Sequence, residues 1–359
     1  MERFATRSVS RSNRLPDWIA TQNLAEGSEV DAGELGVPGR GAVDGTGPGL
    51  AERVAVDPGD RLDHLGRPPR GGEVVPRRPH ARLEAGEQAG ALENLREVEV
   101  VFHLAFPVSD WEAEEKFIAA LKLSDLICRI AEEKAQRLIL TTSVVVYGDK
   151  IGTGPIDEST PYGKSNGYYT EYKQKQEQNA IGHFHRANLD VRIVRPANVY
   201  GAGSKPWVFE VIKVLRQGLP ALIGDGKGRA GLIHVANLVD ILLRVAEDEN
   251  SRGEIYLAAD DNHVAWHTYF SDLAHIARTD PPSSIPRFAS DILAIAGETA
   301  WKTFGIKGRP PLTRQALMLV GADNDFSNKK VREKLGFQPI VSYQQALDEI
   351  ENYVQTQGI

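Results

Sequence analysis

The sequence predicts an α/β fold in which helices flank a doubly wound parallel sheet and a smaller, mostly helical C-terminal lobe follows. Short apolar runs alternate with amphipathic helical patterns between residues 98 and 260. Such alternation is typical of right-handed βαβ units, which build parallel sheets. From about residue 265 onward the pattern is mostly helical. Residues 1–97 show neither pattern, so the N-terminal third is atypical.

The sheet is predicted from short apolar segments that lie between the helical patterns. Buried strands are expected at 98–106, in the first part of 137–148, at 190–196 and at 253–259. Helices are expected at 114–135, 166–186, 208–218, 235–248, 266–278, 287–305 and 342–356. Because helices separate the strands along the chain, the connections favour a parallel order.

Composition excludes several classes of function. The 359-residue chain has a net charge of −7 and a pI near 5.8, which argues against a nucleic-acid partner because phosphate binding needs clustered Lys and Arg. The single cysteine, Cys128, lies in an apolar helical run, is expected in the core, and rules out an internal disulfide framework. His183 and His185 diverge on a helix, so no metal site is expected. No apolar run approaches the ~18 residues of a membrane span.

The N-terminal third differs in composition from the rest of the chain. Before residue 98 lysine is absent, Phe4 and Trp18 are the only aromatic residues, and Arg, Gly and Pro are crowded together. Such a composition cannot bury enough apolar surface to offset chain entropy. The start of the chain also lacks the apolar core of a secretory signal, so a cytoplasmic protein is expected. We divide the chain into an atypical segment at 1–97, a catalytic core at 98–260 and a substrate-binding lobe at 261–359, with parts of 197–235 joining the lobe.

A serine at a strand end and a Tyr-Lys pair on the next helix form the candidate active site. Ser143 ends the strand segment TTS, and Tyr169 and Lys173 follow on the predicted helix, four positions apart. Residues i and i+4 share one face of a helix, and parallel sheets bind ligands at the carboxyl ends of their strands. Tyr168 and Tyr172 therefore point elsewhere, and only Tyr169 pairs with the lysine.

This triad supports proton transfer coupled to hydride transfer to or from a small molecule. A free phenol with a pKa of about 10 is only about 0.1% ionised at neutral pH. An ammonium one turn away favours the phenolate, so Lys173 is expected to lower the pKa of Tyr169. The Ser143 hydroxyl would hold the substrate oxygen near the phenol. An earlier tyrosine, Tyr162, has Asn166 at plus four instead of lysine and is rejected.

Around these residues the sequence resembles the extended short-chain dehydrogenases of the NAD(P)-dependent epimerase/dehydratase family. The matching pieces occur in the family's order: VFHLAF, TTSVVVYGD, Tyr169 with Lys173 and Glu177, VRPANVYGAG, ALIGDGKG and IHVANLVDIL. The resemblance implies a Rossmann-like core that binds NAD or NADP. Tyr169 would be the general acid/base, Lys173 its partner and a ribose ligand, and Ser143 the polarising hydroxyl. The resemblance also implies a homodimer.

The resemblance places further residues against the cofactor: Leu104, Ala105, Thr142, Pro196, Asn198 and Val199. The family's glycine-rich turn should hold the pyrophosphate at a helix N-terminus. Gly33, Gly36 and Gly39 have the GxxGxxG spacing of such a turn, but no apolar strand precedes them. We interpret residues ~20–92 as another reading frame of a GC-rich gene, and the alternative is a divergent or disordered segment.

The substrate is suggested by residues near the IHV segment and by the C-terminal lobe. Sugar-nucleotide members of the family usually carry an Arg-Asp pair where this chain has Ala230 and Gly231, with Arg229 offset by one. The C-terminal text resembles the 3β-hydroxysteroid and sterol dehydrogenase branch, and the helix at 287–305 either covers a hydrophobic substrate or packs in the lobe's own core. We therefore favour an apolar, steroid- or terpenoid-like secondary alcohol or ketone. A nucleotide-sugar epimerase/dehydratase and a non-catalytic relative stay open as alternatives.

Overall fold

The computed structural model describes residues 98–358, except 109–110, 135, 262, 307–309 and 311. The interpretations of residues 1–97, including the glycines at 33, 36 and 39, lie outside the described residues. All positions named for the Ser-Tyr-Lys site lie inside them.

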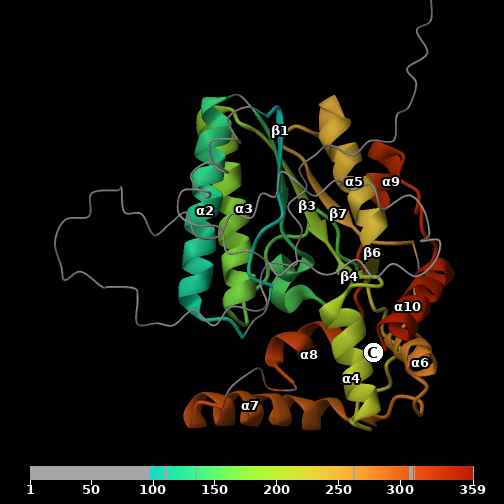
Figure 1. The fold of residues 1–359 in the computed structure, drawn as a ribbon. Helices are drawn as coiled ribbons and strands as arrows, with labels where there is room; N and C mark the ends of the chain where they lie inside the picture. Colours follow the sequence, from blue (N-terminus) through green and yellow to red (C-terminus); the bar gives the residue numbers. More distant parts are fainter. Residues whose placement is uncertain are drawn as a thin grey trace, which may run out of the picture.

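A four-stranded parallel sheet forms the centre of the described chain (Figure 1). Its strands are β1 (Val100–His103), β2 (Arg137–Thr141), β3 (Asp190–Pro196) and β7 (Ile255–Ala258), in the order β1-β2-β3-β7. Each neighbouring pair is parallel. The predicted α/β class and parallel order are thus confirmed. The first strand is shorter than the predicted 98–106 because only its residues 100–103 pair with β2.

Helices cover both faces of this sheet, as a doubly wound fold requires (Figure 1). On one face lie α2 (Glu114–Glu133) and α3 (Tyr168–Ala187), and on the other lie α5 (Val235–Glu247) and α9 (Lys329–Leu335). The two helices of the first face are joined by the buried ring of His183, whose Nε2 lies 2.9 Å from Asp125 Oδ1 and whose Nδ1 contacts Glu132. Cys128 of α2 is buried there too, as expected for a core residue.

The remaining elements form a helical lobe beside the carboxyl ends of the strands (Figure 1). They are η5 (Lys205–Phe209), α4 (Glu210–Arg216), α6 (Trp266–Ala277), α7 (Arg287–Phe304), α8 (Arg314–Val320) and α10 (Tyr343–Gln357), with the short parallel pairs β4 (Asn198–Tyr200) with β6 (Leu232–His234) and β5 (Leu222–Ile223) with β8 (Ser284–Ile285). Short helical turns also occur at η4 (Val144–Lys150) and η6 (Glu249–Ser251). The lobe has its own apolar core, built around Trp266, Tyr269 and Phe270. The domain boundaries stay a prediction.

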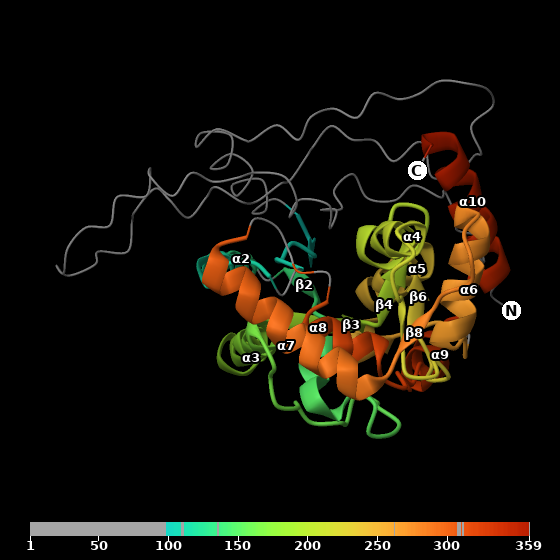
Figure 2. The same cartoon turned by 90° about the horizontal axis from the view of Figure 1, so that it is seen from below.

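Helix α7 crosses the lower end of the molecule, as Figure 2 shows. It buries only a narrow side that includes Ser290 and Ala294. Phe288, Ile292 and Phe304 are 71%, 64% and 77% exposed. Burial in the lobe's own core is therefore wrong for these side chains, and α7 presents an apolar outer surface instead. No helix among the described residues is long and apolar enough to cross a membrane.

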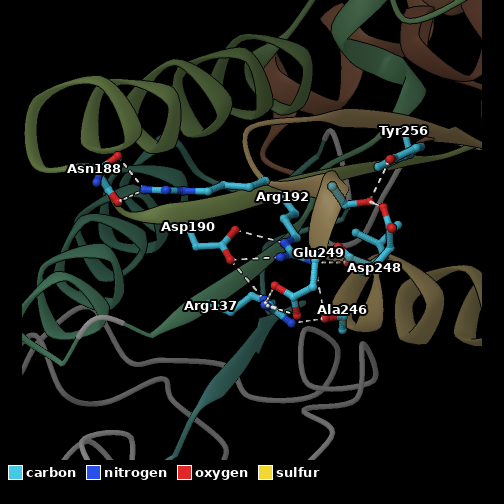
Figure 3. A network of polar contacts seen from close by, with 11 residues as sticks. Arg137, Asn188, Asp190, Arg192, Ala246, Asp248, Glu249 and Tyr256 are labelled. Carbon is cyan, nitrogen blue, oxygen red and sulfur yellow. Dashed lines mark hydrogen bonds and ion pairs between the residues drawn. The ribbon is translucent and has the colours of Figure 1, made fainter. Parts of the chain in front are cut away.

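A polar network joins the C-terminal end of α5 to the strands β2 and β3 (Figure 3). Arg192 of β3 is fully buried and donates to the carbonyl oxygens of Val245 and Asp248, each at 2.6 Å. Its Nε and Nη2 donate to the two carboxylate oxygens of Asp190, each at 2.9 Å. Arg137 of β2 also donates to Asp190, at 3.0 Å. The two guanidinium groups thereby satisfy carbonyls at the C-terminal end of α5, where a helix leaves its acceptors unpaired.

Replacing Arg192 by methionine should strongly destabilise the fold. The change leaves Asp190 with Arg137 as a donor but removes the buried donor to the Val245 and Asp248 carbonyls, and we expect a loss of about 3 kcal/mol in the free energy of unfolding. Urea unfolding followed by circular dichroism measures it. Arg129→Met is the matched control, because that side chain is 66% exposed in its pair with Asp125 and should cost about 0–1 kcal/mol. Equal losses of unfolding free energy in the two variants would contradict the role of Arg192 as a donor to the carbonyls at the end of α5.

Candidate functional site

Ser143 and Tyr169 meet at the carboxyl end of β2. Ser143 follows the strand in an extended conformation, and its Oγ accepts a hydrogen bond from the Val145 amide at 3.3 Å. The preceding Thr142 amide still donates to the Val194 carbonyl at 2.9 Å, so pairing with β3 continues to the residue before the serine. Tyr169 lies in the first turn of α3, and its phenol is hydrogen-bonded to the Ser143 side chain.

The loop between Ser143 and Tyr169 is fixed by a close backbone crossing. Gly148 has φ +49°, a region that favours glycine, and a Cβ on it would lie 2.3 Å from the Lys164 carbonyl oxygen. A Cβ on Gly163 would lie 1.9 Å from the Tyr147 carbonyl oxygen. The side chain of Gln174 donates to the carbonyls on both sides of this crossing, those of Val146 and Gly163, at 2.8 Å each. The crossing therefore fixes the position of the first turn of α3 relative to Ser143.

The three tyrosines near the start of α3 have different surroundings. Tyr169 is buried beside Ser143, whereas Tyr168 is 40% exposed. Tyr172 donates from its hydroxyl to Glu114 of α2 at 3.0 Å and stacks on Phe117. Only Tyr169 faces the strand end, as the spacing of the pair with Lys173 predicts.

Lys173 is buried on the same face of α3, one turn beyond Tyr169. Its Nζ donates to the Thr141 carbonyl at 3.2 Å and to Gln176 Oε1 at 3.1 Å. It also lies 4.2 Å from the centre of the Phe106 ring. An ammonium carries three N–H groups. These two acceptors therefore leave one donor for a further oxygen.

Burial shifts the two ionisable groups in opposite directions. Loss of hydration raises the pKa of the Tyr169 phenol to about 12, against a smaller lowering by the hydrogen bond from Ser143. Loss of hydration also lowers the pKa of Lys173 to about 7, opposed by the charge of Glu177. Removal from water disfavours the charged form of each group. The expected lowering of the Tyr169 pKa by the ammonium is therefore not what the structure shows.

A buried ion pair below the site holds Thr142 in place. The carboxylate of Glu177 on α3 accepts from Arg195 of β3 at 2.6 Å and 3.0 Å, and from Tyr162 at 2.9 Å. It also accepts from the Thr142 hydroxyl at 2.5 Å. Burial and the Glu177 carboxylate raise the pKa of Tyr162, and its hydroxyl is bonded to Glu177 rather than to Ser143. Glu177 lies two turns from Tyr169 on the same buried face of α3, and this spacing is the signal in the sequence that could have indicated its role.

The residues predicted to contact the cofactor gather at one edge of the sheet. Leu104 and Ala105 follow β1, Thr142 follows β2, Pro196 ends β3, and Asn198 and Val199 lie in β4. In a parallel sheet these strand ends share one edge. The Asn198 side chain donates to the Ala230 carbonyl at 2.7 Å, so it braces β4 beside that edge.

Arg229 is engaged by two carboxylates. Its Nε and Nη2 donate to the two carboxylate oxygens of Asp323 at 2.8 Å and 2.6 Å, and its Nη1 lies 2.7 Å from Asp325. The next positions are closed as well. Ala230 is fully buried, and Gly231 has φ +58° with space for no Cβ, which would lie 2.6 Å from the Asn324 Cβ.

Comparison with known proteins gives relatives that are named as dehydrogenases or ketoreductases. The chain is 26% identical over 314 residues to 3beta-hydroxysteroid-dehydrogenase/decarboxylase isoform 1 of Arabidopsis thaliana, covering 83% of this chain and 71% of the relative. It is 26% identical over 266 residues to the human sterol-4-alpha-carboxylate 3-dehydrogenase, decarboxylating, covering 71% of each. A ketoreductase of Stigmatella aurantiaca that acts on a farnesyl dihydroquinoline oxide is 24% identical over 259 residues, covering 71% of this chain and 77% of the relative.

Several solved structures with the same fold are sugar-nucleotide enzymes. UDP-glucuronic acid 4-epimerase from Bacillus cereus superposes with a TM-score of 0.56 at 16% identity, covering 74% of this chain and 78% of the other. The dTDP-glucose 4,6-dehydratase from Streptomyces venezuelae gives 0.56 at 20% identity, covering 75% and 77%. At such identities the likeness shows the fold alone.

The family model supplies the decisive match. Residues 78–259, half of the chain, match the model of the NAD dependent epimerase/dehydratase family. The matched range contains Ser143, Tyr169 and Lys173. The chain belongs to the NAD dependent epimerase/dehydratase family, which confirms the expected short-chain dehydrogenase class, the Rossmann-like fold and a nicotinamide dinucleotide cofactor.

Proposed function

We propose that this protein is an NAD(P)-dependent oxidoreductase that interconverts a secondary alcohol and a ketone on an apolar, steroid- or terpenoid-like substrate. The observation that carries the proposal is the hydrogen-bonded pair of Ser143 and Tyr169 at the strand ends, with Lys173 buried one turn further along α3. In this proposal Tyr169 is the general acid/base, Ser143 orients the substrate oxygen and Lys173 supplies positive charge.

The proton step follows from the protonation state of the phenol. With its pKa raised to about 12, Tyr169 is protonated at neutral pH, which suits the donation of a proton to a ketone oxygen. A reduced nicotinamide held beside Lys173 would supply the hydride for the carbonyl carbon. The Ser143 hydroxyl donates to the same oxygen and stabilises the charge that develops there. The phenolate that Tyr169 becomes is then reprotonated from solvent.

The described residues fit the nicotinamide half of the cofactor. Lys173 has one N–H beyond its two acceptors, which suits a ribose hydroxyl. Leu104, Ala105 and Val199 are partly exposed at the strand ends, where an apolar ring can lie against them. Thr142 and Pro196 would form the floor of this site. The glycine turn for the pyrophosphate falls outside the described residues, so the choice between NAD and NADP stays open.

Three features support an apolar substrate over a nucleotide sugar. Arg229, one position before the place of the usual arginine, is held by Asp323 and Asp325. The named relatives act on sterols and on a farnesylated ring, by their own names. The exposed apolar surface of α7 adds a side of the lobe on which an apolar molecule can rest. A nucleotide-sugar epimerase/dehydratase stays the alternative, since solved structures of that kind share the fold.

Tyr169→Phe should abolish turnover while the protein still binds its cofactor. We expect the rate of ketone reduction to fall by about 10²–10⁴-fold, because the variant keeps the ring and loses the transferable proton. NADH and NADPH affinity, measured by fluorescence titration, should change by less than about twofold, a shift of under ~0.5 kcal/mol.

Tyr172→Phe is the matched control, because Tyr172 lies on the same helix but bonds to Glu114. It should keep wild-type turnover. Full activity in the Tyr169 variant would sink the assignment of the acid/base. A wild-type protein that binds neither cofactor would favour the non-catalytic alternative.

A substrate panel distinguishes the two enzyme readings. We expect NAD(P)H oxidation with polycyclic or prenylated ketones, and none with UDP-glucose or UDP-glucuronic acid. Ser143→Ala should reduce turnover on the ketones by about 10-fold or more, because one donor to the developing oxyanion is removed. Turnover of the UDP-sugars with no reaction of the ketones would support the epimerase/dehydratase reading.

A further inference from the structure

A row of buried polar side chains runs from Lys173 across the space between α2, α3 and the end of β1. Lys173 Nζ donates to Gln176 Oε1 at 3.1 Å, and Gln176 Nε2 donates to Ser124 Oγ at 3.0 Å. Ser124 Oγ lies 2.7 Å from His103 Nε2. All four side chains are at most 3% exposed. Unpaired polar groups at such depth are costly, and each of these four side chains has a hydrogen-bond partner in the row.

The direction of the hydrogen bonds along this row is fixed by the amine. An ammonium can only donate, so the amide oxygen of Gln176 faces Lys173 and its NH₂ group faces Ser124. The Ser124 hydroxyl, having accepted, donates its proton to His103 Nε2. This requires a neutral imidazole. Burial, together with the charge of Lys173, lowers the pKa of His103 to about 3, so the ring is neutral at physiological pH.

The other charged groups near the amine are engaged elsewhere. Glu177 bonds to Arg195 and Thr142, and the Tyr169 phenol bonds to Ser143. Among the described residues, the Gln176 amide is the one side-chain oxygen that accepts a hydrogen bond from Lys173 Nζ. The Thr141 carbonyl and the Phe106 ring complete its surroundings.

We propose that Gln176 is a positioning residue for the reaction inferred above: its amide oxygen accepts a hydrogen bond from Lys173 and fixes the amine one turn from Tyr169, while Ser124 and His103 hold the amide in that orientation. The proposal rests on the proposed function for its link to catalysis. The hydrogen-bond geometry carries it, because the amide is the sole side-chain link between the amine and the α2 and β1 residues of the row.

Two substitutions at position 176 should move the titration of Lys173 in opposite directions. Gln176→Glu puts a carboxylate beside the amine and should raise its pKa by about one unit or more. Gln176→Met keeps the length, removes the acceptor and should lower the pKa. The ¹³Cε resonance of Lys173 in protein labelled with [¹³Cε]lysine, assigned with Lys173→Met, reports the pKa without any turnover.

The pH profile of ketone reduction gives the second readout. If the ammonium form is the active one, activity falls as pH rises through the Lys173 pKa. The alkaline limb should then move to higher pH in Gln176→Glu and to lower pH in Gln176→Met. A residue with a purely structural role would lower activity at all pH values and leave the limb in place.

Ser124→Ala and Gln178→Glu complete the test. Ser124→Ala frees the amide and should shift Lys173 in the same direction as Gln176→Met, by less, and it carries the test if a variant at 176 does not fold. Gln178→Glu adds the same charge on the exposed side of α3 and should shift nothing. Folded variants in which Lys173 titrates as in the wild type would overturn the inference. Shifted titration in a protein without turnover would count against the proposed function instead.

Discussion

The buried ion pair between Glu177 and Arg195 is the interaction on which the arrangement of the site depends. Glu177 is fully buried on α3, and Arg195 is 3% exposed on β3. Their contacts, at 2.6 Å and 3.0 Å, join the helix that carries Tyr169 to the strand beside Ser143. A buried charge whose partner is lost is strongly destabilising. The pair therefore tolerates little sliding of α3 along the sheet, and the distance from phenol to serine is fixed by it.

The same pair leaves the buried Lys173 amine without a carboxylate as a hydrogen-bond partner. Because Glu177 already accepts from Arg195, Thr142 and Tyr162, it has little left to offer the amine. Lys173 must rely on a backbone carbonyl and on the Gln176 amide. Neutral acceptors stabilise an ammonium less than a carboxylate does. The pKa of about 7 follows from the loss of hydration on burial, which the charge of Glu177 opposes only in part.

The sequence predicted the elements with strong local patterns and missed the contacts that cross between elements. The strand at 190–196 matches β3 at both ends, and the helix pattern placed Tyr169 and Lys173 on one face. The link from Gln176 to Ser124 and His103 joins residues on three elements, and nothing in a local period indicates it. Arg195 and Arg192 did leave a signal, because a charged residue in an otherwise apolar strand requires a buried partner. The segment after Ser143, predicted only as following a strand, forms the helical turn η4.

The spacing of Tyr169 and Lys173 in the sequence could not predict the pKa values of the two side chains. Positions i and i+4 bring two side chains to one helix face, but their pKa values depend on how much water and which partners surround each. Here both groups lose water, which raises the pKa of the phenol and lowers that of the amine. A protonated phenol is ready to donate and unready to accept. The buried phenol therefore starts as a proton donor, and its use as a proton acceptor would need a further positive charge beside Tyr169 to stabilise the phenolate.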